Sequence, residues 1–246
     1  MIALKMGGSI ITYKSRRFSI NTEAIEHMAA ELSQFNRPLF LVHGGGSWGH
    51  PLAIKFKLSS SSYKMEPTGV GRTRAAMLAL SSRVQSALVD AGLEPFYISA
   101  QHLLQSEKLI RTLAAAGAIP LSFGDVVHED RGFRVMGGDE IIKKVNDMIH
   151  FERVIFAMDT PGVLDSYGRT IKTLTRRELR LFEGKANDAT GGLAAKLRFS
   201  FELAENGADV FLLKGDEGDE LLKALNGQSF HGTTVKVLRD HRRKEG

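Results

Sequence analysis

Two glycine-rich stretches, each directly after a hydrophobic run, contain the residues best suited to chemistry. Lys5-Met-Gly-Gly-Ser9 follows the apolar residues 1–4, and His43-Gly-Gly-Gly-Ser-Trp-Gly-His50 follows residues 38–42. Glycines allow backbone N–H groups to approach anionic oxygens that larger side chains would keep away. Lys5 and His50 can meet a phosphate with positive charge or hydrogen bonds. The pattern predicts a site that holds two phosphate groups near each other, as phosphoryl transfer requires.

The elements that must position these residues alternate between strands and helices. Hydrophobic spacing predicts strands at 2–6, 38–42, 94–99, 119–126, 153–158, 210–213 and 232–238, and helices at 22–35, 72–90, 139–150, 192–206 and 217–226. A hairpin turn is expected at 128–133, and the serine-rich residues 58–63 are expected to be mobile. The alternation predicts an α/β fold, an open αβα sandwich with a mostly parallel central sheet.

Ligands of such sheets bind at the carboxyl ends of the strands. Lys5, the stretch that starts at His43, the residues 123–125 and Asp159 each follow a predicted strand. We therefore expect them to converge at one edge of the sheet.

Composition limits the class of protein. The 246 residues suit one domain, 1–246, with a softer division into a substrate-binding lobe, 1–150, and a nucleotide-binding lobe, 151–246. No apolar run reaches the ~18 residues of a membrane span, and no secretory segment is evident. The chain has no cysteine, so disulfides and thiolate metal sites are excluded, and a cytoplasmic location is expected.

A net charge of +5 favours anionic ligands. Nucleic-acid binding is not expected, because the basic residues are scattered and no known nucleic-acid motif is present.

Common nucleotide-binding motifs do not account for the glycines. Gly44, Gly46 and Gly49 satisfy G-x-G-x-x-G, but they follow the second predicted strand and Pro51 comes directly after them. The Gly-Lys-Ser/Thr end of a P-loop is absent, as are the paired motifs of protein kinases.

Four segments together resemble the amino acid kinase (carbamate kinase-like) superfamily. They are Lys5-Met-Gly-Gly-Ser9, the His43-Gly-Gly-Gly stretch, Asp159-Thr-Pro-Gly-Val163 and Thr190-Gly-Gly-Leu-Ala-Ala-Lys196. Within that superfamily the chain most resembles the isopentenyl phosphate kinases. The second lysine, Lys14, and the closing His50 support this, and Ser122-Phe-Gly-Asp-Val126 and Gly138-Asp139 also fit. Gly137, Ala189 and Leu193 differ from the residues that are usual at these positions of the family motifs.

The resemblance implies the amino acid kinase fold and a homodimer. It also implies a phosphoryl-transfer reaction. ATP, accompanied by Mg²⁺, would phosphorylate isopentenyl phosphate to isopentenyl diphosphate in isoprenoid biosynthesis. The acceptor is a phosphate monoester with a second pKa of about 6, so it needs no general base at neutral pH. The difficulty lies in bringing two anions together, so catalysis should rest on positioning and charge neutralisation.

The resemblance also implies roles for individual residues. The catalytic residues would be Lys5, Lys14, His50 and Lys196, with Lys14 stabilising the transition state. The residues expected to bind the acceptor are Gly44, Gly49, His50 and Gly124. The residues expected to bind ATP are Lys5, Gly7, Gly8, Ser9, Gly45, Asp159, Gly191 and Lys196. Backbone N–H groups of Gly8, Ser9, Gly44, Gly45 and Gly191 are the expected phosphate donors. Asp139 would orient the lysines, and no protein metal ligand is expected.

The isoprenoid tail needs an apolar slot. The candidates that would line it are Val70, Met77, Leu80, Phe123, Val126 and Ile141.

Other interpretations of these residues stay open. Lys14 has Arg16 and Arg17 nearby and fits a solvated basic turn. His50 fits a structural role, Asp139 fits a helix N-cap, and Asp159 fits a turn residue before Pro161. Alternative functions are a kinase of another small phosphate or phosphonate such as fosfomycin, or a non-catalytic basic ligand-binding protein.

Overall fold

The computed structural model describes residues 1–59, 63–65, 67–180, 182 and 192–237. Its centre is an eight-stranded sheet with the order β3-β4-β2-β1-β7-β9-β10-β8. The strands in that order are β3 (Pro95–Tyr97), β4 (Ile119–Phe123), β2 (Leu39–His43), β1 (Ile2–Met6), β7 (Arg153–Met158), β9 (Asp209–Lys214), β10 (Gly232–Val235) and β8 (Thr173–Leu174). Neighbouring strands pair in parallel, except that β10 is antiparallel to β9.

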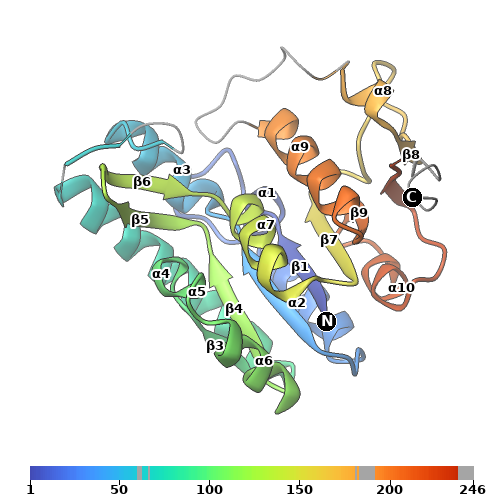
Figure 1. Ribbon diagram of the computed structural model, residues 1–246, viewed down its shortest axis with the longest axis horizontal. Helices are drawn as coiled ribbons and strands as arrows, with labels where there is room; N and C mark the ends of the chain where they lie inside the picture. The colour runs from blue at the N-terminus through green and yellow to red at the C-terminus, as the bar shows by residue number, and fades with distance from the viewer. Residues whose placement is uncertain (60–62, 66, 181, 183–191, 238–246) are drawn as a thin grey trace, which may run out of the picture.

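Helices cover both faces of this sheet (Figure 1). One face packs against α2 (Thr22–Leu32), α4 (Pro67–Asp90) and α10 (Glu220–Asn226). The other packs against α5 (Ala100–Leu103), α6 (Glu107–Ala115), α7 (Gly138–Ile149), α8 (Arg176–Leu179) and α9 (Gly192–Glu205). The predicted open αβα sandwich is therefore confirmed.

Strand β1 shows how the sequence divides the core between the two faces. Successive side chains of a strand point to opposite faces. Ile2, Leu4 and Met6 belong to the core beneath α2 and α4, whereas Ala3 belongs to the core beneath α7. The same alternation places Lys5 on the α7 side, at the carboxyl end of the strand. Both faces of the sheet are buried, which explains the nearly continuous hydrophobic runs.

The structure differs from the prediction around the glycines. Each glycine segment continues into a helix, α1 (Gly8–Ile11) or α3 (Gly46–Lys55), where the sequence predicted no helix. Pro51 lies inside α3 rather than beyond a turn. Helix α6 was also missed, although its hydrophobic residues gather on one face; only Ile110 and Ala114 are buried on it.

The predicted strand 119–126 divides in two. Its first part is β4, and Gly124 separates it from β5 (Asp125–Glu129). Strand β5 pairs with β6 (Gly132–Met136) in an antiparallel hairpin, so the expected turn within 128–133 is confirmed. The prediction of mobility at 58–63 falls partly on residues 60–62, and the predicted strand 232–238 ends at residue 238; these positions lie outside the described residues.

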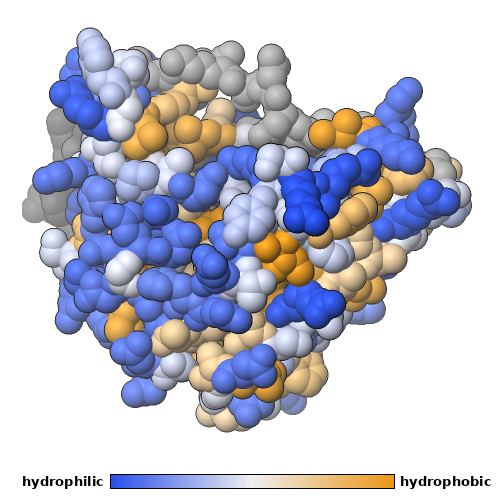
Figure 2. All heavy atoms as spheres, turned by 180° about the vertical axis from the view of Figure 1, so that it is seen from behind, coloured by the Kyte–Doolittle hydropathy of each residue, from blue (hydrophilic) through white to orange (hydrophobic). Residues whose placement is uncertain are grey.

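The opposite side of the molecule, shown in Figure 2, mixes polar side chains with scattered hydrophobic ones. Within the described ranges, no helix is long and apolar enough to cross a membrane.

Candidate active site

The carboxyl ends of the parallel strands bring the predicted residues together. Lys5 on β1 is in register with Val42 on β2 and with Phe156 on β7. Consequently the two glycine turns and Asp159, which follow these strands, lie at one edge of the sheet. This is the convergence that the sequence predicts.

The two glycine turns pack against each other through their backbones. A Cβ atom on Gly8 would lie 2.3 Å from the Gly46 nitrogen, and one on Gly44 would lie 2.5 Å from the Gly8 nitrogen. Gly7 meets the next strand in the same way, because its Cβ would lie 2.7 Å from the Ala157 carbonyl oxygen. These glycines are therefore required for the close approach of three backbone segments, in addition to any contact with phosphate.

This packing corrects one prediction about the phosphate donors. The N–H of Gly44 donates to the Met6 carbonyl at 2.9 Å, so it is not directed at a ligand. The N–H groups of Gly7 and Gly124 are used similarly, for the carbonyls of Ala157 and His43. Gly8 and Gly45 differ, because they lie at the starts of α1 and α3, where helices leave N–H groups without intrahelical partners. Gly191 lies outside the described residues.

Asp139 brings two lysines together at the start of α7. Its Oδ1 accepts from Lys5 Nζ at 2.6 Å and from Lys196 Nζ, on α9, at 3.0 Å. All three side chains are at most one-fifth exposed. Gly138 makes room for this arrangement, since its Cβ would lie 3.1 Å from Lys5 Cε. Asp139 does not cap the helix, because Gly137 is the N-cap residue.

Burial and charge determine the protonation of this triad. Burial lowers the pKa of Lys5 to about 8; the neighbouring Lys196 lowers it too, while Asp139 raises it. Burial alone would raise the pKa of Asp139, but the charges of Lys196 and Lys5 outweigh it and hold that pKa well below its usual range. Asp139 is therefore an anion, and Lys5 loses its proton more easily than an ordinary lysine.

A second ion pair lies at the end of β7. Asp159 accepts from Ser9 Oγ at 2.7 Å and from Lys14 Nζ at 2.8 Å. Burial opposes ionisation of Asp159, yet its hydrogen bonds with Lys14 and Ser9 leave its pKa below the usual value. The Lys14 side chain is 71% exposed, so a bound anion can reach it. Lys14 is therefore paired with Asp159, the aspartate that the sequence analysis assigned to ATP binding.

His50 lies on α3, one turn after the helix start, and is partly buried. Gly49 keeps α3 close to α4, because its Cβ would lie 2.7 Å from Met77 Sδ. Gly45 meets the same sulfur at 3.1 Å. The base of the second glycine turn is therefore apolar on the α4 side.

The predicted tail-pocket residues separate into two groups. Val70 and Val126 share a small cluster with Ala53 and Leu58, between α3, α4 and the β5–β6 hairpin. Leu80 and Ile141 belong instead to the two main cores, and their assignment to the pocket stays a prediction. Packing against the sheet governs them, and hydrophobic spacing cannot distinguish the two roles.

Phe123, also predicted to line the pocket, lies between two aromatic rings. Its ring is stacked on Tyr97 with centroids 5.0 Å apart and lies 5.1 Å from His43. Burial lowers the pKa of His43 to about 4, so this histidine is neutral beneath the glycine turn.

A buried arginine that the sequence analysis missed connects the hairpin to α7. Arg134 on β6 binds Glu140 through both terminal nitrogens, at 2.8 and 3.0 Å, and binds Glu129 on β5 through Nε at 3.0 Å. Tyr63 donates to the same Glu129 at 2.7 Å. Arg134 lowers the pKa of Glu129 to about 2. Since Glu140 follows Asp139, the network fixes the turn that holds the two lysines; no sequence spacing indicates it, because its members come from separate elements.

The carboxylates of the site do not form a ready-made metal cage. In the described part of the chain, no group of three or more histidine, aspartate or glutamate residues is arranged to hold an ion. Asp139 and Asp159 are each engaged by lysine. This donor set fits a Mg²⁺ ion held mainly by phosphate oxygens and water.

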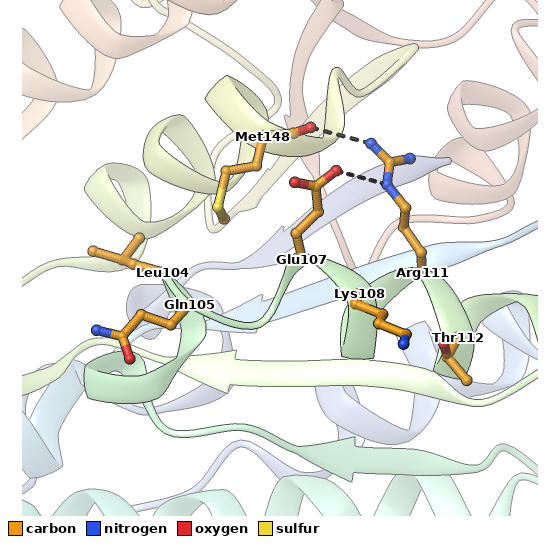
Figure 3. Close-up of a pocket in the computed structure, with 7 residues that line it drawn as sticks. All are labelled: Leu104, Gln105, Glu107, Lys108, Arg111, Thr112 and Met148. Atoms are coloured by element: carbon orange, nitrogen blue, oxygen red, sulfur yellow. Dashed lines mark hydrogen bonds and ion pairs between the residues drawn. The ribbon is translucent and has the colours of Figure 1, made fainter.

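A surface hollow between α6 and α7 lies away from these groups (Figure 3). Arg111 crosses it to Glu107 and to the Met148 carbonyl. Met148 is nine residues after Asp139 on the same helix, roughly 13 Å along its axis. The hollow is therefore not part of the candidate active site.

Comparison with known proteins agrees with this geometry. The amino acid kinase family model matches residues 1–214. Isopentenyl phosphate kinase of Methanothermobacter thermautotrophicus is 29% identical, across 96% of this chain and 98% of the relative. That of Thermoplasma acidophilum is 28% identical, across 96% of this chain and the whole relative.

Solved structures agree as well. A structure of an isopentenyl phosphate kinase superimposes with a TM-score of 0.81 at 25% identity, covering 96% of this chain and all of the other. The product complex of the T. acidophilum isopentenyl phosphate kinase has a TM-score of 0.79 at 22% identity and supports the fold.

Proposed function

Because the chain belongs to the amino acid kinase family, we propose that it transfers the γ-phosphoryl group of ATP to isopentenyl phosphate. The products are isopentenyl diphosphate and ADP. The observation that carries the proposal is the shared carboxylate of Asp139, which holds Lys5 and Lys196 together at the strand ends. Relatives named isopentenyl phosphate kinase, aligned over nearly their full lengths, support this choice of acceptor.

The reaction joins two anions, and the chain supplies the compensating charge. An oxygen of the acceptor phosphate attacks the γ-phosphorus, and the bond to ADP breaks. Lys5 and Lys196 neutralise the negative charge of the γ-phosphoryl group. Lys14 stabilises the charge that develops in the transition state. The N–H groups of Gly8 and Gly45 lie at helix starts beside this path.

His50 binds the acceptor phosphate in this account. A neighbouring phosphate favours the charged imidazolium, which strengthens the hydrogen bond. Gly49 and Gly124 are the glycines we assign to the acceptor side, although the N–H of Gly124 is directed at the His43 carbonyl. The cluster of Val70, Val126, Ala53 and Leu58 is the proposed contact for the isoprenoid tail.

We assign the two substrates to different halves of the sheet. Strands β1 to β4 come from residues 1–150, and β7 to β10 come from residues 151–246. We assign acceptor binding to the first half and ATP binding, with Asp159 and Lys196, to the second. A Mg²⁺ ion that accompanies ATP would supply further positive charge. A homodimer and a cytoplasmic location stay predictions.

A panel of acceptors tests the function. ADP release would be measured with isopentenyl phosphate, dimethylallyl phosphate, fosfomycin, uridine monophosphate and N-acetylglutamate. We expect the highest kcat/KM with isopentenyl phosphate, alone or with its dimethylallyl isomer. Higher efficiency with fosfomycin would keep the phosphoryl-transfer site and reject the proposed acceptor. No acceptor-dependent ADP release would favour the non-catalytic alternative.

A further inference from the structure

The loop that carries Lys14, residues 13–19, is closed around one hydroxyl group. Ser19 is 9% exposed, and its Oγ accepts from the Tyr13 N–H at 3.1 Å. The same oxygen lies 2.9 Å from the Tyr13 carbonyl and 2.7 Å from that of Arg16. A hydroxyl has one proton to donate and two lone pairs, so Ser19 Oγ can accept from the Tyr13 N–H and donate to one of these carbonyls, which ties the end of the loop to its beginning. We call residues 13–19 the Lys14 loop.

Helix α3 holds this closed loop from outside. The indole N–H of Trp48 donates to the Ser19 carbonyl at 2.8 Å, and the hydroxyls of Ser19 and Ser47 lie 3.2 Å apart. The Phe18 ring packs edge-on against the Trp48 ring with centroids 5.4 Å apart. Two successive residues of one helix therefore bind two successive residues of the loop.

Pro51 explains a further bond between helix and loop. A proline in a helix interior is destabilising, because it lacks the N–H that would bind the carbonyl four residues earlier. In α3 that carbonyl is the one of Ser47, and it accepts instead from the Phe18 N–H at 3.3 Å. Phe18 has a φ of 52°, which is uncommon for a bulky residue and persists only where surrounding contacts enforce it.

We propose that Ser19, Ser47 and Trp48 are positioning residues that fix the Lys14 loop on α3, and we call them the latch. His50 comes two residues after Trp48 on the same helix. The latch thus holds the loop of the transition-state lysine at a set place relative to the histidine of the acceptor phosphate. The effect of the latch on turnover rests on the proposed function of Lys14. Its effect on the opening of the Lys14 loop can be measured independently of that function.

Limited digestion with trypsin measures how readily the Lys14 loop opens. The loop contains the cleavage sites Lys14, Arg16 and Arg17, and cleavage requires local opening. Ser19→Ala and Trp48→Phe should increase the rate of cutting at these sites on the order of tenfold. The matched control is Ser33→Ala, at an exposed hydroxyl bound to the Ala30 carbonyl. Trypsin should cleave the Lys14 loop of this variant at the wild-type rate. Equal loop cleavage in Ser19→Ala and wild type would overturn the proposal.

Pro51→Ala separates loosening of the loop from loss of stability. Alanine restores an N–H that competes with Phe18 for the Ser47 carbonyl, and it also removes the penalty of an interior proline. We expect faster loop cleavage together with an unchanged or higher melting temperature. General destabilisation cannot produce this combination. Loop cleavage at the wild-type rate in Pro51→Ala would contradict the proposal.

A double-mutant cycle with Lys14→Met tests the catalytic effect. Ser19→Ala should lower kcat on the order of tenfold with little change in either KM, because a small displacement of a catalytic group is costly. In the Lys14→Met background it should lower kcat no further. The same loss in both backgrounds would show that the latch does not act through Lys14. Wild-type turnover of Lys14→Met itself would reject the proposed catalytic role of Lys14, and the digestion would still decide whether the latch exists.

Discussion

Lys5 on β1 and Lys196 on α9 share one carboxylate oxygen, Oδ1 of Asp139, although they are far apart in the sequence. Two ammonium groups this close repel each other unless an anion lies between them. The arrangement therefore prepares two positive charges for a phosphoryl group before any substrate arrives. Preorganised charge of this kind is the main source of catalysis when both reactants are anions.

Replacing Asp139 with asparagine should separate the two lysines without changing the volume of the side chain. Steady-state turnover should fall by about 10²-fold or more, comparable to the loss of a preorganised oxyanion donor. The matched control is Asp147→Asn on the same helix, where the carboxylate makes an exposed pair with Lys143. Comparable turnover in Asp139→Asn and Asp147→Asn would remove Asp139 from the mechanism.

The depressed pKa of Lys5 predicts an alkaline limit to activity. Above pH 8 the free enzyme loses the Lys5 proton, so kcat/KM for ATP should decrease about tenfold per pH unit. The acceptor sets the acid side, because kcat/KM for isopentenyl phosphate should fall below its second pKa of about 6. In Asp139→Asn the alkaline limit should move to lower pH, since Asp139 raises the Lys5 pKa. A wild-type profile that is flat to pH 9.5 would contradict the assignment to Lys5.

His50→Ala should discriminate between the two substrates. A hydrogen bond to a charged group contributes about 1.5–3 kcal/mol, so kcat/KM for the acceptor should fall about tenfold to a hundredfold. ATP affinity, measured by calorimetry, should change little. His102→Ala, which removes an exposed ring bound to Ser99, serves as the control. Equal loss for ATP and acceptor would assign His50 a structural role.

Arg134→Met should destabilise the protein and reduce turnover together. It leaves Glu140, whose side chain is 18% exposed, without its cation. Breaking a buried ion pair costs about 3–5 kcal/mol, which for a chain of this size lowers the melting temperature by about 10 °C.

Two further variants test the cause. Combining Arg134→Met with Glu129→Gln and Glu140→Gln should recover part of the stability, because no buried charge is then unpaired. Arg111→Met, which breaks an exposed pair with Glu107, should cost less than about 1 kcal/mol. An unchanged melting temperature in Arg134→Met would show that the network does not hold α7.

The sequence predicted the sheet and its central residues, because buried parallel strands leave continuous hydrophobic runs. The alternation with helices predicted a mostly parallel sheet, so Lys5 and Asp159, which follow predicted strands, could be placed at one edge. Helix α3 could not be predicted, since Gly46, Gly49 and Pro51 are poor helix formers and tertiary contacts override their propensity. The glycines lie close together at the strand ends, but Gly44 contributes close packing where an N–H donor was expected.

The supporting contacts escaped prediction for a different reason. Ser19 and Trp48 are 29 residues apart, and Arg134 joins two glutamates on separate elements. Such pairs carry no periodic signal in a single sequence. They arise only when the fold places the loop on α3 and the hairpin on α7.

Transfer of label from [γ-³²P]ATP follows the proposed phosphoryl transfer itself. The enzyme would be incubated with isopentenyl phosphate, and the products would be separated and counted. We expect one label in the terminal phosphate of isopentenyl diphosphate for each ADP formed, and loss of this transfer in Asp139→Asn but not in Asp147→Asn. Label released as inorganic phosphate at a rate independent of the acceptor, with none in the diphosphate, would contradict the proposed transfer.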